Sequence, residues 1–349
     1  MEVWDAVGFE ESGRSFIVQN TDEKTLMAST SGGSFSAFAR VIIEDGGAVY
    51  GAAYDDLEVV HARATSLIEA EAFRGSKYVQ SQVGKVFTSV REDLSSGMDV
   101  LFSGTPCQVA GLLSFLKAIG VKDEERQRLF TVDFVCHGVG SPLALNQYIA
   151  MQKDRGFDVA RMNMRSKHYG YRNSCMELAD KRGRVKRVFT REDGFLRAFY
   201  GNLMLRPSCY ACGFKSVCRV SDLTIWDSWN AEDILDRSYE TRGFTNVVVQ
   251  SEKGLRLLEQ AAVALSVWEV PFCRIRPKNG GMMLHSAKPN MQNEAFLEEV
   301  KKCGFSAAVS RFMPINPTAR FREVVKKVLY RVGFLDFCSR AKRRIEGLR

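Results

Sequence analysis

Two cysteines separated by two residues are the part of the sequence best suited to chemistry. Cys209 and Cys212, followed by Cys218, lie in the segment Arg206 to Trp229, which ends in a strand-like pattern. A Cys-x-x-Cys pair places two thiolates on one turn, where both can bind one metal centre, and neighbouring cations favour the thiolate. Iron–sulfur clusters and structural zinc sites usually take four ligands, so the other ligands must come from elsewhere. Without them, a disulfide-forming or redox-inert pair is an equally good interpretation.

Two more cysteines each stand between a strand pattern and a helix pattern. Cys107 follows an apolar strand pattern and a turn that includes Gly104 and Thr105, and Cys136 repeats the arrangement after the next strand pattern. If the two strands are parallel neighbours, both cysteines lie at the carboxyl edge of the sheet, where open α/β sheets bind ligands. The spacing therefore predicts one four-cysteine site, formed by Cys107, Cys136, Cys209 and Cys212. His137 is a further candidate ligand, although a hydrogen bond to the site is its favoured role.

Two glycine-bearing segments have the composition of a phosphate or nucleotide site. The first is the turn Ser31, Gly32 and Gly33, which feeds a helix with Phe35, Phe38, Ala39 and Ile42 on one face. Its backbone amides and the helix dipole suit an anion, although a plain turn and N-cap is the favoured interpretation without other support. The second segment combines a flexible glycine, a cation and an aromatic ring that can stack, in Gly75, Ser76, Lys77 and Tyr78. An ordinary loop between two helices is the slightly favoured interpretation of this segment on local evidence.

Composition indicates an ordinary globular protein. A chain of 349 residues with 45% apolar content is long enough for two lobes. No stretch approaches ~18 uninterrupted apolar residues, and the first residues lack the basic and apolar regions of a signal peptide. We therefore expect a cytoplasmic protein. In that compartment the nine cysteines more often bind metal or react than form disulfides.

The positive charge of the chain is concentrated at its end. The net charge is +8, and the residues from Thr318 onward contain ten Lys or Arg against three acidic residues. The body is close to neutral, so we expect no nucleic-acid partner. The last predicted helix, residues 320–347, carries an apolar stripe flanked by basic residues: Val324, Val325, Val328, Leu329 and Val332. It fits an anionic membrane surface, a protein partner or the protein's own body.

The order of the patterns predicts a mixed, partly parallel α/β sheet flanked by helices, with a cysteine-rich loop and a C-terminal helical extension. Strand patterns begin at residues 3–9, and two strands with a hairpin turn at 181–184 fill the middle of the chain. A basic and aromatic cluster between those strands suits an anionic group, or else a solvated strand end: Arg165, Lys167, His168, Tyr169 and Arg172. Among the other cysteines, we expect Cys175 in the core and a structural role for Cys273, Cys303 and Cys338.

Taken in order, five segments resemble one known family. They are STSGGSFSAFARVIIEDGGAVYGAAYD, RGSKYVQS, LFSGTPCQVAGLLSFL, VDFVCHGVGSP and LRPSCYACGFKSVCRVSDLTIWDSW. Their sequence and separations, from Val3 to Glu299, are similar to the coenzyme F420 hydrogenase/dehydrogenase beta-subunit family. The resemblance implies a protein in which FAD mediates between a hydride carrier and a 4Fe-4S cluster.

The resemblance also implies roles for particular residues. The family's cluster cysteines fall on Cys107, Cys136, Cys209 and Cys212, its Ser-Gly-Gly turn on Ser31 to Gly33, and its Gly-Ser-Lys-Tyr segment on Gly75 to Tyr78. Residues 1–300 would then form the flavin and iron–sulfur catalytic domain, and residues 301–349 a basic helical extension.

The sequence departs from the family pattern at three places. The N-terminal ferredoxin segment of many relatives is absent. The Asp-Phe-Trp-Gly motif of the family is replaced by Asp227, Ser228, Trp229 and Asn230. Cys218 is an additional thiol able to replace one ligand. We therefore expect electrons to pass to a separate ferredoxin-like or redox-enzyme partner. Lys215 and Arg219 would give the cysteine loop a positive surface that attracts an acidic ferredoxin.

Two other functions are compatible with the same residues. One is a zinc-stabilised accessory protein without catalysis, for example in cell-envelope polysaccharide biosynthesis. The other is an enzyme that modifies small molecules on a reused fold. Metal and flavin analysis of the purified protein separates them from the redox function, because zinc without iron or flavin excludes it.

Overall fold

The computed structural model describes residues 14–237, 241–276, 280–315, 317–335 and 337–338. The strand predicted at residues 3–9 lies outside them. The chain divides into two compact units: unit 1 consists of Met1–Val139, Arg206–Asp236 and Arg242–Lys288, and unit 2 of Gly140–Leu205, Arg237–Thr241 and Pro289–Arg349. No boundary between these units falls at residue 300. The functional division into 1–300 and 301–349 stays a prediction.

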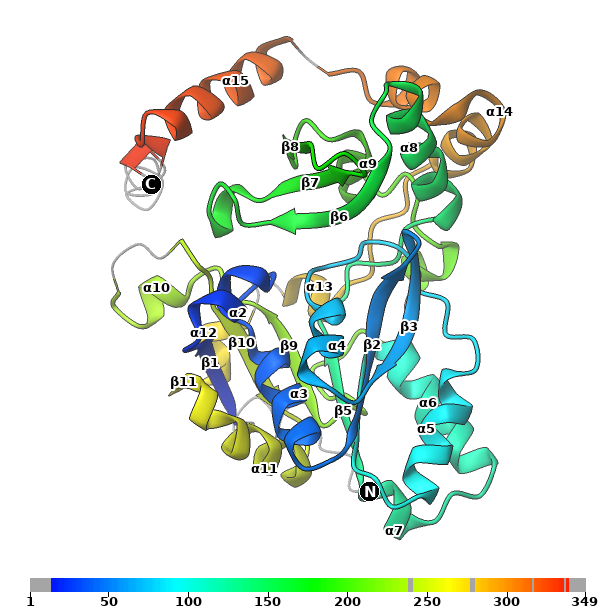
Figure 1. The fold of residues 1–349 in the computed structure, drawn as a ribbon, viewed down its shortest axis with the longest axis vertical. Coiled ribbons are helices and arrows are strands. Elements are labelled where there is room, and N and C mark those ends of the chain that lie inside the picture. Colours follow the sequence, from blue (N-terminus) through cyan, green and yellow to red (C-terminus); the bar gives the residue numbers. More distant parts are fainter. Residues whose placement is uncertain (1–13, 238–240, 277–279, 316, 336, 339–349) are drawn as a thin grey trace. The chain divides into compact units, whose positions relative to one another are not determined.

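Unit 1 is built on an eight-stranded mixed sheet of order β11-β1-β10-β9-β5-β4-β2-β3 (Figure 1). Four adjacent strands, β9, β5, β4 and β2, run parallel, and the remaining pairs are antiparallel. This sheet confirms the predicted fold class. Its strands are β1 (Ser15–Asn20), β2 (Ala48–Asp55), β3 (Glu58–Ala64), β4 (Val100–Gly104), β5 (Leu129–Phe134), β9 (Leu223–Asp227), β10 (Thr245–Val249) and β11 (Leu265–Glu269).

Successive residues of a strand point to opposite faces of the sheet. Because successive residues here are apolar, both faces are buried. In β4, Leu101 joins the apolar cluster that contains Phe38 of α3 and Leu257 of α11, whereas Phe102 joins the cluster that contains Leu112 of α6. Figure 1 shows α3 and α11 close together, apart from α5 and α6. The helices of unit 1 are α2 (Glu23–Ala28), α3 (Ser34–Glu44), α4 (Leu67–Ala70), α5 (Val86–Ser95), α6 (Pro106–Ala118), α7 (Asp123–Arg126), α10 (Ala231–Ile234), α11 (Glu252–Ala261), α12 (Phe272–Ile275) and α13 (Gly281–Leu284), with 3-10 turns η1 (Glu71–Phe73), η3 (Pro207–Ala211) and η4 (Ala262–Ala264).

The parallel pair β4 and β5 confirms the arrangement expected for the two strand–cysteine–helix patterns. Their register runs from Val100 opposite Leu129 to Gly104 opposite Asp133. Pro106 opens α6 directly after β4, as its fixed φ and missing N–H favour at a helix start. Both strands therefore end at the same edge of the sheet, and the two cysteine-bearing turns leave from that edge.

Unit 2 combines a three-stranded antiparallel sheet with helices. The sheet of β6 (Val159–Ser166), β7 (Cys175–Asp180) and β8 (Val185–Phe189) contains the predicted hairpin, closed by the Asp180 N–H donating to the Arg184 carbonyl at 3.0 Å. A buried hydrogen bond of 2.7 Å from the Tyr148 hydroxyl to Asp193 joins α8 to the start of α9. Cys175 is fully buried, as predicted. The helices are α8 (Pro142–Asp154), α9 (Gly194–Tyr200), α14 (Asn293–Phe312) and α15 (Pro317–Arg331), with the 3-10 turn η2 (Tyr171–Asn173).

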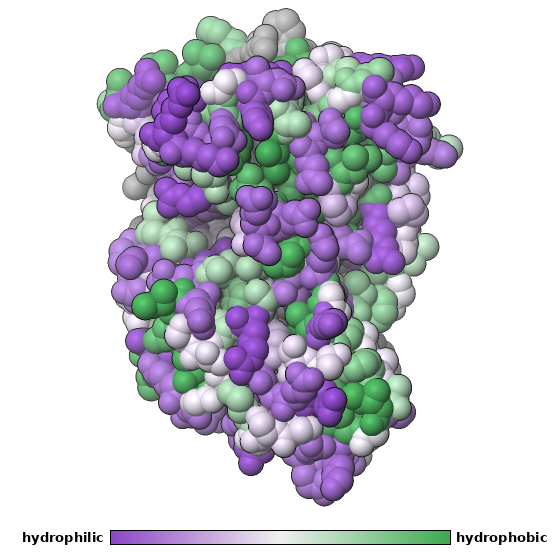
Figure 2. Space-filling view, turned by 45° about the vertical axis from the view of Figure 1, so that its right-hand side comes forward, coloured by the Kyte–Doolittle hydropathy of each residue, from purple (hydrophilic) through white to green (hydrophobic). Residues whose placement is uncertain are grey.

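No helix in the described ranges is long and apolar enough to cross a membrane. On the face shown in Figure 2, hydrophilic residues are interspersed with small groups of apolar ones.

The turn that enters α3 packs tightly on the sheet and provides a test of the fold. A Cβ atom added at Gly32 would lie 2.5 Å from the Thr245 nitrogen and 2.5 Å from the Val18 oxygen, both backbone atoms of neighbouring strands. We expect Gly32→Ala to lower the free energy of unfolding by about 1–3 kcal/mol or more. Gly111→Ala is the matched control, since its Cβ would meet only Phe87 at 3.6 Å and it lies within α6. Urea unfolding should show Gly111→Ala unchanged or stabilised by up to about 1 kcal/mol, and an equal effect of both variants would contradict the packing argument.

Candidate functional site

Cys107 stands in the first turn of α6, one residue after Pro106. Its side chain is exposed, and its sulfur lies 3.1 Å from the Thr105 hydroxyl oxygen. The side-chain oxygen of Gln108 accepts from the Thr105 N–H at 2.9 Å, which fixes the turn between β4 and the helix. Cys107 is therefore an accessible thiol on a rigid helix start.

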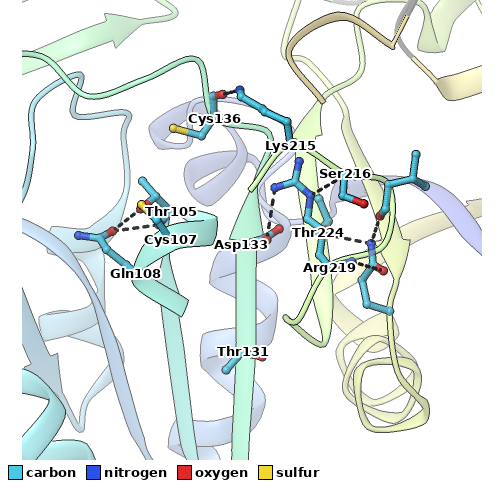
Figure 3. Close-up of polar contacts among 12 residues, drawn as sticks. Thr105, Cys107, Gln108, Thr131, Asp133, Cys136, Lys215, Ser216, Arg219 and Thr224 are labelled. Atoms are coloured by element: carbon cyan, nitrogen blue, oxygen red, sulfur yellow. Dashed lines mark hydrogen bonds and ion pairs between the residues drawn. The ribbon is translucent and has the colours of Figure 1, made fainter. Parts of the chain in front are cut away.

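Cys136 follows β5 and is more enclosed. The pKa of its thiol is raised to about 12, mainly by burial and also by negative charge on Cys209 and Cys107, whereas the Lys215 ammonium opposes the shift. The Lys215 ammonium also donates to the Cys136 carbonyl at 2.5 Å. In Figure 3 the Cys136 sulfur points toward the side of the view on which Cys107 lies.

The Cys-x-x-Cys pair is held beside this edge by backbone hydrogen bonds. Cys209 lies within η3, and the N–H of Arg206, directly before that turn, donates to the Val139 carbonyl at 3.0 Å. The Cys212 N–H donates to the Ser286 hydroxyl at 3.0 Å. The first contact brings the pair to the loop that follows Cys136, and the second ties it to the segment after α13.

The four predicted ligands act on one another electrostatically. Burial raises the pKa of Cys209, and negative charge on Cys107 and Cys212 adds to the shift, as Cys209 and Cys107 do for Cys136. Across the described ranges, however, no three His, Cys, Asp or Glu side chains stand close enough to hold a metal ion. The thiols share a neighbourhood without forming a closed ligand set, and their role as ligands stays a prediction.

A buried ion pair braces the loop between the Cys-x-x-Cys pair and β9. The Arg219 guanidinium, with a side chain 3% exposed, lies 3.5 Å from the fully buried Asp133 carboxylate of β5 (Figure 3). Burial raises the pKa of Asp133 to about 6, while the Arg219 charge opposes the shift. Gln250 completes the brace: its amide donates to the Val217 carbonyl at 2.9 Å and accepts from the Arg219 N–H at 3.2 Å.

These contacts correct one expectation about the surface of the loop. Arg219 is enclosed, and Lys215 donates to the carbonyls of Cys136 and Met282 at 2.5 and 2.8 Å. The predicted positive surface is therefore wrong for Arg219, whereas Lys215 is half-buried with its ammonium on two backbone carbonyls. Sequence alone favoured exposure since charged side chains are seldom buried unless paired.

The other cysteines occupy different surroundings. Cys218 packs against the apolar cluster of Val217 and Phe244, which favours a packing role over replacement of a ligand. Three further cysteines are exposed, and the structural role predicted for them stays a prediction: Cys273, Cys303 and Cys338. His137 is half-buried in the loop after Cys136, and its hydrogen-bonding role stays a prediction.

The predicted phosphate turn is held by the sheet that supports it. The Ser31 hydroxyl donates to the Phe244 carbonyl at 2.5 Å, and the Gly32 N–H donates to the Thr245 hydroxyl at 2.8 Å. Gly33 is the N-cap of α3 and has a φ of 77°, a conformation that favours glycine. Glycine is thus required here by backbone approach and conformation.

The start of α3 keeps donors that the turn does not use. No side chain caps the helix. The Ser34 hydroxyl is buried, and within the described residues it has no hydrogen-bond partner. A helix start of this kind offers backbone amides, the positive end of the dipole and one buried hydroxyl to an anion.

The second predicted segment meets the first through Ser76. Its N–H and hydroxyl contact the Thr30 hydroxyl oxygen at 2.8 and 3.1 Å. The Lys77 ammonium instead turns back on its own segment, donating to the carbonyls of Ala72, Arg74 and Gly75 at 3.1–3.2 Å. Burial lowers the pKa of Lys77 to about 7. The structure thus joins Ser76 to the turn and holds Lys77 within the segment.

A chain of hydrogen bonds, missed by sequence reasoning, links this segment to Cys107. His61 is buried, with Nδ1 2.8 Å from the Ser81 hydroxyl and Nε2 3.0 Å from the Ser103 carbonyl. Gln108 continues the chain, donating to Ser81 at 2.8 Å and accepting from the Thr105 hydroxyl at 3.0 Å.

The direction of every bond in this chain follows from its first member. Because a carbonyl only accepts, His61 must carry its proton on Nε2, so Nδ1 accepts from the Ser81 hydroxyl. Ser81 then accepts from Gln108, and the single Thr105 proton goes to the Gln108 oxygen. A protonated Cys107 must therefore donate to Thr105. The Thr-x-x-Gln spacing of a capping box was the sequence signal for Gln108; nothing local indicated His61.

The basic cluster of unit 2 is packed rather than solvated. Arg165 and Lys167 are 8% and 4% exposed, and both lie over the Tyr171 ring, at 5.7 and 5.9 Å. The Tyr169 ring stacks on Phe189 with centroids 4.4 Å apart. The interpretation as a solvated strand end is therefore wrong, and binding of an anionic group stays a prediction.

Comparison with known proteins supplies one family and one fold. The family model for the C-terminal region of the beta subunit of coenzyme F420 hydrogenase/dehydrogenase matches residues 97–272. The fold is similar to a chain of the xenon-derivatised F420-reducing NiFe hydrogenase complex from Methanosarcina barkeri, with a TM-score of 0.53 and 18% identity over 84% of this chain and 93% of that one. No curated protein matches the sequence.

The neutral His61 predicts a pH dependence of stability. Burial lowers the pKa of His61 from the ordinary 6.5, so below about pH 6.5 the unfolded chain binds a proton that the folded chain resists. As the pH is lowered below about 6.5, the free energy of unfolding should therefore decrease, by up to about 1.4 kcal/mol per pH unit. His61→Phe keeps a ring against Phe102 but cannot titrate, so urea unfolding should show a less stable protein with a flatter pH profile. The exposed His285 is the control; if His285→Gln flattens the profile as much, His61 is not responsible.

Proposed function

Since the chain belongs to the coenzyme F420 hydrogenase/dehydrogenase beta-subunit family, as its C-terminal family region shows, we propose that it is an FAD- and iron–sulfur-dependent oxidoreductase. It would move electrons between a hydride carrier, F420 or another, and a redox partner. Family membership supports oxidoreductase chemistry, and the particular cofactors are supported by the residues at the sheet edge.

The observation that supports the proposal is that Cys107 and Cys136 follow the parallel strands β4 and β5, while the Arg206 N–H holds the Cys209 turn at the Val139 carbonyl. Cys107, Cys136, Cys209 and Cys212 would hold a 4Fe-4S cluster, which carries single electrons when bound. Without a bound metal centre, burial raises the pKa of the Cys136 thiol to about 12 despite the Lys215 charge, so the thiol stays protonated. Cluster ligands must be thiolates, and an uncompensated thiolate is unfavourable in this buried site. A positively charged metal centre would compensate that charge, so the site favours binding one.

The flavin residues would lie on the turn before α3 and the segment joined to it. The first-turn amides and the buried Ser34 hydroxyl suit the pyrophosphate of FAD. Ser31 and Gly32 would act by holding the turn on β10, and Ser76 by fixing the second segment at Thr30. Gly75, Lys77 and Tyr78 would complete the segment beside the cofactor. Gly104 and Thr105 would line the site from the end of β4.

Hydrogen bonds through Gln108 connect Ser81 to Thr105 and so link the two proposed sites, and His61 contacts Ser81 as a side branch. Ser81 follows the flavin segment, and Thr105 contacts Cys107 at 3.1 Å. The residues between them are held by bonds of 2.8–3.0 Å, so their positions are mutually fixed. The chain would thus keep both sites in a constant geometry.

A partner would approach the exposed residues beside the cysteines. Phe214 and Met282 are 41% and 47% exposed, and Lys215, adjacent to Phe214, donates to the Met282 carbonyl at 2.8 Å. Apolar side chains over a redox centre suit a ferredoxin-like protein or redox enzyme. The similar hydrogenase chain belongs to a complex, which is consistent with such a partner.

The cluster proposal is tested by metal analysis after anaerobic purification. Wild type should contain iron, acid-labile sulfide and flavin, and Cys209→Ser should lose most of its iron because thiolate ligands are required. Cys273→Ser is the matched control, as Cys273 is exposed and outside the predicted set. Absorption spectra and metal content are the measurements. Zinc without iron or flavin in wild type would replace this function with a zinc-stabilised accessory role.

The flavin proposal is tested at the link between its two segments. Thr30→Val removes the oxygen that Ser76 contacts twice. Loss of about 1.4 kcal/mol of binding free energy would weaken FAD binding roughly tenfold. Thr30→Ser should restore it, and Thr21→Val, which loses only the 3.2 Å contact to the Ala264 carbonyl, should leave it unchanged. Flavin content is measured by fluorescence after denaturation; unchanged flavin in Thr30→Val with intact iron would place FAD elsewhere.

A further inference from the structure

Helix α15 packs on unit 2 with its polar side. Glu323 is 4% exposed and pairs with Lys326 at 2.8 Å, and Lys327 pairs with Glu192 at 2.9 Å. The Tyr330 ring lies 4.7 Å from that of Tyr169. These four residues of the helix recur at three- and four-residue spacing, so they form one face.

The opposite face of α15 is apolar and exposed. Phe321, Val324, Val325 and Val328 are 69%, 53%, 38% and 52% exposed, and Val332, directly after the helix, is 58% exposed. Their spacing places them together on the side opposite the packed residues. The helix is therefore oriented in the reverse of the usual sense for a surface helix, with its charged side inward and its apolar side outward.

The excess of basic residues around this face favours an anionic binding surface. Ten basic and three acidic residues occur from Thr318 to the end of the chain. Within α15, the ion pairs described above engage two of the lysines, whereas Arg331 is exposed. An apolar helix face set in a strongly basic segment is the pattern of a helix that lies in the interface of an anionic bilayer.

We propose that the exposed face of α15, formed by Phe321, Val324, Val325, Val328 and Val332, binds an anionic membrane surface. The apolar side chains would enter the boundary between headgroups and acyl chains, and the basic residues of the segment would contact the lipid charges. Such an attachment through one helix face is peripheral. It goes beyond the proposed redox function and does not depend on it.

The test is flotation of the full-length protein with vesicles. Wild type should float with vesicles of phosphatidylcholine and phosphatidylglycerol, much less with phosphatidylcholine alone, and less as salt rises. Val325→Glu with Val328→Glu should weaken binding at least about tenfold, because two charges enter the apolar face. The matched control, Ile68→Glu with Val263→Glu, adds the same charge at residues of unit 1 that are 84% and 88% exposed, and should weaken binding far less.

Three outcomes would overturn the proposal. The first is wild type that does not float with anionic vesicles, and the second is an equal loss in the face and control variants. The third is light scattering that shows a wild-type dimer converted to monomer by the face variant without lipid binding, which would assign the face to a second copy. If the glutamate variant fails to fold by circular dichroism, Val325→Ser with Val328→Ser replaces it, and undiminished flotation of that variant equally contradicts the proposal.

Discussion

The parallel pairing of β4 with β5 is the constraint on which the candidate site depends. Because these strands run side by side in register, the turns after them leave the sheet at one edge, and Cys107 and Cys136 leave with them. β5 pairs on its other side with β9, parallel as well. The loop that carries Cys209 and Cys212 must therefore run beside β5 to reach the start of β9. β5 thus lies between β4, which leads to Cys107, and β9, which follows the cysteine loop.

Buried charge then holds that loop in place. Asp133 near the end of β5 has no exposure, and Arg219 of the loop is its ion partner at 3.5 Å. Removing either group would leave the other charge uncompensated in a poorly solvated surrounding, which is far more costly than losing a surface pair. Lys215 and Lys77 follow the same logic with neutral acceptors, since backbone carbonyls receive both ammonium groups. Cations that suggest ligand binding in the sequence are thereby committed to local structure.

The sequence was sufficient for features that depend on local chemistry. Apolar strand patterns predicted β4 and β5, the pattern after the Gly104–Thr105 turn predicted a helix where α6 lies, and the hairpin at 181–184 followed from its turn. Features that depend on distant contacts were beyond it. No local pattern pairs Arg219 with Asp133, turns Lys77 toward the Ala72 carbonyl, or places His61 between Ser81 and Ser103. In α15 the periodicity was correct, but which face packs inward is decided by Glu192, Tyr169 and Phe189, which lie far away in the chain.

The position of β1 has a consequence for how the protein is made. Its two neighbours in the sheet are β10 and β11, which close only at Val249 and Glu269. During synthesis β1 therefore has no strand partner in this sheet until most of the chain has been made. Unit 2 segments emerge in the interval, so unit 1 cannot be completed first even though it begins the chain. The turn at Gly32, which the Thr245 hydroxyl holds on the sheet, therefore takes its final position only after the chain has been made to β10.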